Sequence, residues 1–391
     1  MHNDQLKSLV NERVAEGRQG LSFVNRSIVY KDAPALFDLL DYENDDIFLE
    51  PILFQYSHLS DELQNLPQIM FGYLADDQKP ELLTVLTNKK GTAYIPKFGH
   101  IYTDAANTKI TLNWDRDQKR FVGLRDSGYQ LLRTVSAQYR DGFEIYQDEI
   151  VELNHYFGID HSREDLGVAA QYKLHEDEMD QSFRVIKSIY PEFHQVLNDA
   201  LKSFYLFKTK TNRSFATIQS MGISYLNVED ENGLIFFLED IIHQSAHNIF
   251  YYVLADEDVF SVNPTDPMSL YSSHPNAHGD VYGTFHGLFT LTNITEFLSR
   301  CIAQNTFDGL QHLEVQGRIS DNMKRFKTAL EVFDERKIYT DLGWELYGML
   351  KASYESVYQE NHELIASFET SNQPYVFSFK KFLEANPVVA Q

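Results

Sequence analysis

Two histidines four residues apart are the sharpest chemical feature of the sequence. His243 and His247 fall in LIFFLEDIIHQSAHNIFYYVL (residues 234–254), whose length and apolar content predict a helix. Residues four apart lie on one face of a helix, so both imidazoles can bind one metal ion. Imidazole nitrogens suit zinc or ferrous iron, and three protein ligands leave coordination positions open for substrate.

The third ligand has to come from another segment, and the histidines downstream are the first candidates. His286 is our choice, because it lies in GTFHGLF (residues 283–289), where flanking glycines permit close approach of the backbone. Asp280 is the alternative and would give a triad of two histidines and one carboxylate. His274 and His278 lie in a polar loop and are expected to be exposed.

The residue after the first histidine separates this pattern from that of the zinc peptidases. In those enzymes it is a glutamate that acts as general base, whereas here it is Gln244, whose neutral amide cannot accept a proton. Hydrolysis by the standard route is therefore disfavoured. Glu239, one helical turn before His243, can orient a ligand histidine or serve as a relocated base. The candidate catalytic residues are Glu239, as orienting group or base, and Gln244, which occupies the position of the peptidase glutamate.

The stretch from about 181 to 330 resembles the HExxH-motif proteins of gene clusters for ribosomally made, modified peptides. The shared order comprises a helix with a Tyr-Pro-Glu step, a strand pair, the HxxxH helix, a Tyr-Ser element and a Gly-x-x-His-Gly turn. In this sequence the steps with fixed residues are Tyr190-Pro191-Glu192, His243 to His247, Tyr271-Ser272 and Gly283 to Gly287.

Some members of that family resemble 2-oxoglutarate-dependent, non-haem iron peptide hydroxylases. The resemblance implies that iron is held by His243, His247 and His286, and that 2-oxoglutarate chelates the metal through its keto acid end. Its distal carboxylate would need a cationic or hydroxyl partner. Candidates for this cofactor-binding role are Arg300 and Tyr271, with Arg213 and Arg318 as further arginines.

Two departures from the family pattern bear on this activity. Gln244 replaces the family's glutamate, and the loop just before Gly283 lacks the arginine that relatives tend to carry.

The elements around these residues predict an α+β protein that is predominantly helical, with small antiparallel sheet elements, the HxxxH helix and a C-terminal helical bundle. The period-two pattern of residues 91–125 predicts strands, with a hairpin turn at DRDQ (115–118). Residues 61–74, 79–86 and 126–176 are predicted to be helical, and SFATIQSMGISYLNV (214–228) a strand and hairpin.

Two regions are expected along the 391 residues. Residues 1–175 would form an N-terminal helical region with a small sheet, for substrate recognition or an accessory role. Residues 176–391 would form the metal-binding region with the C-terminal helices, in which Pro191 starts a helix and residues 255–283 form a long polar loop.

Composition limits the partners. Acidic residues outnumber basic ones 57 to 34, and the formal charge of -23 disfavours nucleic acids and anionic membranes. The single cysteine, Cys301, excludes an intrachain disulfide and is expected to be a small buried residue of a helix. No signal core and no apolar run of membrane-spanning length is found, so a cytoplasmic location is expected.

The sequence therefore predicts an enzyme, a mononuclear non-haem iron oxygenase that uses Fe(II) and 2-oxoglutarate. Its substrate would be a peptide or peptide-like small molecule in natural-product biosynthesis, and a homodimer is compatible with the sequence. Two alternatives stay open: a non-catalytic scaffold that binds a peptide or a carrier domain, and a zinc hydrolase with a relocated base.

Overall fold

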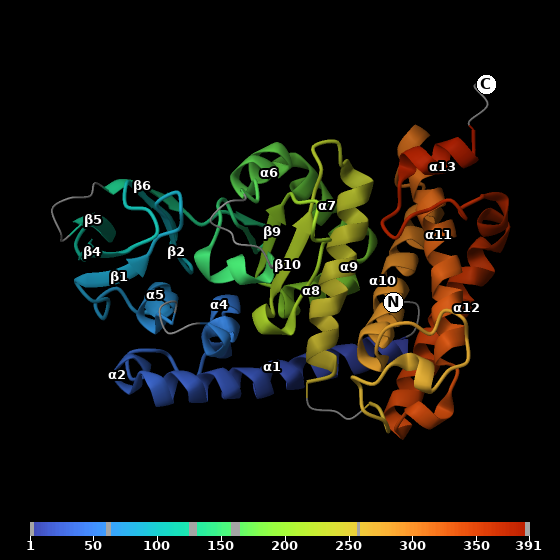
Figure 1. The fold of residues 1–391 in the computed structure, drawn as a ribbon, viewed down its shortest axis with the longest axis horizontal. Helices are drawn as coiled ribbons and strands as arrows, with labels where there is room; N and C mark the ends of the chain where they lie inside the picture. The colour runs from blue at the N-terminus through green and yellow to red at the C-terminus, as the bar shows by residue number, and fades with distance from the viewer. Residues whose placement is uncertain (1–3, 60–63, 125–130, 158–164, 256–258, 388–391) are drawn as a thin grey trace. The chain divides into compact units, whose positions relative to one another are not determined.

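The structure, a computed structural model, describes residues 4–59, 64–124, 131–157, 165–255 and 259–387 (Figure 1). It is an α+β protein in which helix predominates, as the sequence predicts. The chain divides into two compact units. Unit 1 comprises Met1–Ala15, Gln181–Asp199 and Gly233–Gln391, and unit 2 comprises Glu16–Asp180 and Ala200–Asn232.

Unit 2 contains three small sheets. Two are antiparallel, with strand orders β1-β4-β5 and β2-β3-β6, and the third is mixed, with order β10-β9-β8-β7. The strands are β1 (Leu82–Leu86), β2 (Thr92–Ile95), β3 (Gly99–Thr103), β4 (Lys109–Asp115), β5 (Arg120–Leu124), β6 (Leu131–Ser136), β7 (Tyr139–Arg140), β8 (Phe143–Ile145), β9 (Ser203–Phe207) and β10 (Ile223–Asn227).

Helices pack with these sheets, and the described residues of unit 2 include two apolar cores. The helices of unit 2 are the main part of α1 (Asp4–Asp32), then α2 (Pro34–Phe37), α3 (Asp45–Phe48), α4 (Pro51–Gln55), α5 (Leu66–Met70) and α6 (Val168–Leu174). One core gathers aromatic rings around Phe71 and Trp114, whose ring centroids lie 5.2 Å apart. The other lies around Tyr205 and Tyr225 of the mixed sheet.

Unit 1 is built from helices. They are α7 (Glu176–Ile189), α8 (Pro191–Ala200), α9 (Leu234–Val253), α10 (Val281–Ala303), α11 (Gly309–Phe333), α12 (Asp341–Ser367) and α13 (Phe379–Ala385). Helix α10 packs against α9, α11 and α12 and is buried along most of its length, which confirms the C-terminal helical bundle. Pro191 is the first residue of α8, where its missing N–H costs no hydrogen bond, as predicted.

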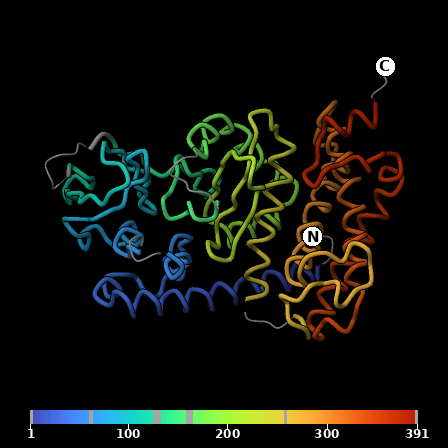
Figure 2. The backbone as a smooth tube through the Cα atoms, in the orientation of Figure 1, coloured from blue at the N-terminus to red at the C-terminus, as the bar shows by residue number. Residues whose placement is uncertain are grey.

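Figure 2 traces the described part of the predicted polar loop after α9. Main-chain hydrogen bonds tie this part to the start of α10. Val281 donates to the Asp266 carbonyl at 3.0 Å, and Met268 donates to the Gly279 carbonyl at 2.9 Å. The described part of this loop also contacts α12, where the Val259 carbonyl lies close to Gly343. This approach is possible because glycine has no side chain. A Cβ there would lie 2.0 Å from that oxygen.

Several element predictions are wrong. Within 79–86, Leu82–Leu86 form strand β1 instead of a helix, and the described part of 126–176 contains β6 to β8 before α6. Within 214–228 the predicted strand is β10, and the predicted hairpin is confirmed in part, because Phe215 forms an isolated antiparallel bridge with Tyr225. The hairpin at 115–118 is confirmed, with Asp115 opposite Arg120.

The two predicted regions also differ from the two units. Their boundary after residue 175 falls close to the break between Asp180 and Gln181. Residues 214–228, which are predicted to lie in the metal-binding region, belong to unit 2 together with β9, and the first residues of α1 belong to unit 1. No helix among the described residues is long and apolar enough to cross a membrane.

Candidate functional site

Helices α9 and α10 bring the three predicted histidines together in unit 1. His243 and His247 lie one turn apart on α9, with their ring centroids 5.2 Å from each other. The ring of His247 stacks on that of His286 from α10 at 5.5 Å, with an angle of 16° between the planes. The Nδ1 atoms of His247 and His286 are 3.3 Å apart. Thus ring contacts join His247 to both of the other histidines.

His286 is part of a helix and not of a turn, which corrects the sequence prediction. Asp280 is the N-cap of α10, and its carboxylate accepts a hydrogen bond from the Gly283 N–H at 2.6 Å. This cap starts the helix two residues before Gly283, so His286 is carried by its second turn. Asp280 is exposed and engaged in capping, and this placement gives no support to its role as the alternative third ligand.

Burial keeps the three imidazoles neutral. It lowers the pKa of His243 and His247, and it lowers the pKa of His286 to about 3. Repulsion from His243 and His286 lowers the pKa of His247 further. A neutral imidazole is the form that binds metal. The Nε2 atom of His286 is buried and has no hydrogen-bond partner among the described residues.

Aromatic side chains surround His286. The ring centroids of Phe250, Tyr251 and Tyr282 lie 4.7, 5.0 and 4.4 Å from that of His286. Burial raises the pKa of Tyr251 to about 12, so it stays a neutral phenol. Tyr282 is one turn before His286 on α10, a spacing that could have drawn attention to it in the sequence.

A buried arginine lies beside the cluster. The Arg318 guanidinium, from α11, is 3.0 Å from Glu239 Oε2 and 2.7 Å from Glu314 Oε1, and it lies over the Phe377 ring at 4.9 Å. The charge of Glu239 acts on His243, one turn further along α9, against the effect of burial. Glu239 therefore links the histidines to an ion-pair network.

The donor atoms fit a metal in part. Two nitrogens bound to one tetrahedral ion at about 2.0–2.1 Å lie roughly 3.3–3.4 Å apart, which is the spacing of His247 and His286. Within the described ranges, however, no group of three or more His, Cys, Asp or Glu side chains is arranged to hold a metal ion. The rings are in contact, but a third nitrogen does not converge with the other two.

The remaining predicted site residues lie apart from the cluster or are engaged elsewhere. Arg300 is fourteen residues along α10 from His286, a rise of roughly 21 Å, and it pairs with Glu192. The Tyr271 hydroxyl donates to Asp266 at 2.5 Å. The position of Arg300 does not support its cofactor-binding role. The hydrogen bond to Asp266 likewise does not support a cofactor-binding role for Tyr271.

Gln244 and the other singled-out residues have structural surroundings. The buried Gln244 amide donates to Asp240 at 3.1 Å, one turn back on the helix. Arg213 belongs to unit 2. Cys301 is buried as predicted, and burial raises the pKa of its thiol to about 12, which makes it a poor nucleophile. His278 is exposed, as predicted, while His274 is partly buried and lies 3.6 Å from Glu331.

Comparison with known proteins adds no assignment: no family model matches the chain, and no curated protein does.

Proposed function

We propose that His243, His247 and His286 bind one metal ion, preferably iron, and that the protein is a non-haem iron oxygenase. The observation that carries the proposal is the contact of three neutral histidines from two helices. Two of their nitrogens, Nδ1 of His247 and Nδ1 of His286, are 3.3 Å apart. Neutral imidazole nitrogens at that spacing can bind one ion together.

The chemistry would divide between the metal and the chain. Ferrous iron with 2-oxoglutarate supplies the two-electron reduction of dioxygen that drives C–H hydroxylation. The three imidazoles would bind the iron. Phe250, Tyr251 and Tyr282 would exclude bulk water from the side of His286. Glu239 would hold His243 in position through its charge.

The co-substrate needs a cation, and Arg318 takes the place of Arg300 in this proposal. Arg318 is linked to the cluster through Glu239, whereas Arg300 is far along α10. The Arg318 guanidinium already contacts two carboxylates, so the distal carboxylate of 2-oxoglutarate would displace Glu239 or Glu314. The peptide or peptide-like substrate, in natural-product biosynthesis, is supported by the resemblance of residues 181–330.

A non-catalytic, peptide- or carrier-binding scaffold is the second candidate. It is favoured by the missing convergence of three ligand atoms in the described residues. The zinc hydrolase has less support, because the Glu239 carboxylate that would serve as base is paired with Arg318.

Anaerobic titration of the apo-protein with Fe(II) tests the proposal. We expect about one iron per chain, and a weak visible absorption band when 2-oxoglutarate chelates the ferrous ion. Zinc with peptide-bond cleavage that disappears in Glu239→Gln would point to the hydrolase. No bound metal after loading with either ion would favour the scaffold.

Single substitutions locate the metal. We expect His247→Ala and His286→Ala each to abolish iron binding, because each removes a nitrogen of the close pair. His362→Ala is the matched control, since His362 is exposed on α12. Full occupancy in His286→Ala would contradict the proposed third ligand, provided that circular dichroism shows a native fold.

A further inference from the structure

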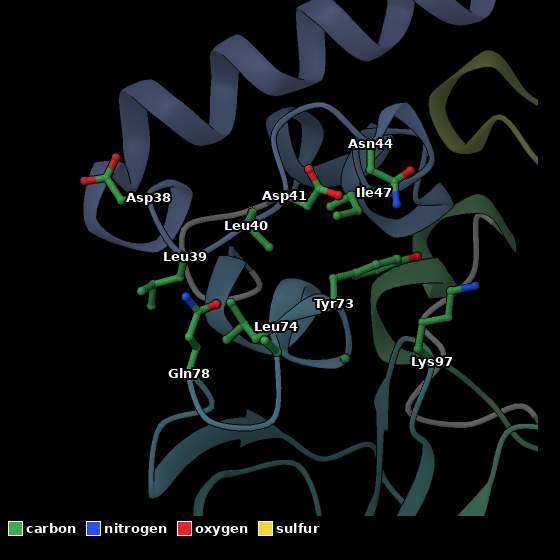
Figure 3. Close-up of a pocket in the computed structure, with 12 residues that line it drawn as sticks. Asp38, Leu39, Leu40, Asp41, Asn44, Ile47, Tyr73, Leu74, Gln78 and Lys97 are labelled. Atoms are coloured by element: carbon green, nitrogen blue, oxygen red, sulfur yellow. The ribbon is translucent and has the colours of Figure 1, made fainter.

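A surface groove of about 650 Å³ opens in unit 2, and it has no part in the histidine cluster (Figure 3). Its walls come from residues 38–47, around α2 and α3, and from residues 72–78 beyond α5, with Lys97 at one end. The apolar lining includes Leu39, Leu40, Ile47 and Leu74. The volume lies in the range of sites that take small ligands or peptide side chains.

The groove contains two carboxylates without a cationic partner. Asp38 and Asp41 both line it, both are exposed, and neither forms an ion pair with any residue in the described ranges. The Asp41 carboxylate accepts a hydrogen bond from the Glu43 N–H at 3.2 Å. In Figure 3 Asp38 lies at the end of the groove away from Lys97, and Asp41 lies between the two, next to Ile47.

Lys97 does not neutralise these two aspartates. Its ammonium lies 5.8 Å from the Tyr73 ring and 5.9 Å from the Tyr139 ring, and its charge acts on the buried carboxyls of Glu50 and Glu144. The cation is therefore directed to another group of acids. The Asp38 side of the groove keeps a negative charge, within a chain whose formal charge is -23.

Tyr73 gives the groove a fixed wall. Its hydroxyl donates to Glu50 Oε2 at 2.5 Å, and Glu50 is itself held by the Ile52 N–H at 3.1 Å. Glu50 is buried, so the tyrosine is anchored from behind. A wall held by such bonds can accept a ligand without reorganising, which lowers the cost of binding.

Aromatic side chains continue next to the carboxylates. Tyr42 directly follows Asp41 and is 57% exposed. Its ring stacks on Phe37 at 6.5 Å, and Phe37 contacts the 61% exposed Tyr30 at 5.3 Å. Exposed aromatic faces attract the ammonium and guanidinium groups of lysine and arginine. Apolar lining, unpaired carboxylates and aromatic faces together fit one kind of ligand.

We propose that this groove binds a basic, amphipathic peptide segment. One lysine or arginine head group would bind Asp41 and the neighbouring Tyr42 ring and a second would bind Asp38 at the end of the groove, while aliphatic side chains between them would pack on Leu39 and Leu74. Charge complementarity selects this occupant over an acidic or neutral one. The site is independent of the metal, because it lies in the other unit and uses none of the histidines.

Fluorescence anisotropy with the apo-protein tests the inference. The probe is a fluorescein-labelled octapeptide of alternating lysine and leucine, and the comparison peptide carries glutamate for each lysine. We expect the lysine peptide alone to bind, and more weakly as salt is raised, since exposed charges are screened. The double variant Asp38→Asn/Asp41→Asn should weaken binding about tenfold, because the charge-assisted contacts are lost.

A matched variant controls for net charge. Glu345→Gln/Glu363→Gln removes two charges from exposed positions of α12 and should leave binding unchanged. Equal losses of peptide affinity in both double variants would show that only the overall charge matters, and this would overturn the inference. So would binding of the glutamate peptide with equal affinity. Self-association that disappears in Leu39→Ser, without peptide binding, would assign the groove to a second copy of the chain instead.

Discussion

Burial decides which side chains of this protein carry charge at neutral pH. It lowers the pKa of His286 to about 3, so that a base becomes a neutral nitrogen donor. It raises the pKa of Glu144, next to Tyr94, to about 8, so that an acid keeps its proton. The first effect prepares a ligand for a metal, and the second makes the stability of unit 2 depend on pH.

The raised pKa of Glu144 predicts that the folded chain loses stability as pH rises. Its pKa is raised in the folded chain above the usual value near 4.3, so the folded state binds the proton more tightly than the unfolded state. The resulting stability is fully present below about pH 4 and is lost as pH rises towards 8. We expect Glu144→Gln to raise the free energy of unfolding at pH 8 by up to about 4–5 kcal/mol.

Urea denaturation at pH 5 and pH 8 measures this effect. The difference between Glu144→Gln and the parent should be larger at pH 8, while Glu363→Gln, at an exposed position, should show no such difference. An equal effect of Glu144→Gln at both pH values would contradict a raised pKa.

At the scale of elements, the start of α10 sets the place of His286. Asp280→Ala removes the cap that accepts from Gly283, and we expect it to lower the free energy of unfolding by about 1 kcal/mol. Asp280→Asn should restore most of this stability, because asparagine also caps helices well. Iron binding should survive in Asp280→Asn, and its loss would make this carboxylate a ligand.

The Arg318 network joins α9 to α11. Arg318→Met leaves Glu239 and Glu314 without their cation in a largely buried place, and we expect a loss of about 3–5 kcal/mol in thermal or urea unfolding. Adding Glu239→Gln and Glu314→Gln should recover much of it. The exposed pair of Lys351 and Asp334 gives the comparison: Lys351→Met should cost less than about 1 kcal/mol. Equal costs would show that burial adds nothing.

Elements with long or regular patterns could be predicted from the sequence, while short apolar runs could not. The apolar length of α9 and the period of β4 and β5 are local signals, and both elements are found. Strand β1 reads as a helix because a five-residue apolar run suits either state, and only its pairing with β4 selects the strand. The parallel pairing of β9 and β10 likewise depends on partners far away in the chain.

The same limit applies to the candidate site. The spacing of His243 and His247 fixes their common face, so the pair could be found from the sequence. The glycine at 283 predicts a turn at His286, whereas Asp280 caps a helix that contains both residues. The sequence favours Arg300 over Arg318, whereas the structure links Arg318 to the histidines through Glu239, because the distance of each arginine depends on how α10 and α11 pack.

At the scale of the whole molecule, the charge of -23 sets the partners that the protein can meet. We expect no binding to a short DNA duplex in a gel-shift experiment at physiological salt, because phosphate backbones are repelled. A retarded band that resists added salt would contradict this expectation. The same charge favours the basic peptide proposed for the groove in unit 2.

Iron K-edge X-ray absorption of the Fe(II)-loaded protein tests the central claim most directly. The account predicts a first shell with the multiple-scattering pattern of three imidazoles, at about 2.0–2.2 Å, and of two imidazoles in any sample of His286→Ala that retains iron. A spectrum without imidazole scattering, or one unchanged in His286→Ala, would show that the metal is bound elsewhere and that the histidine cluster has another role.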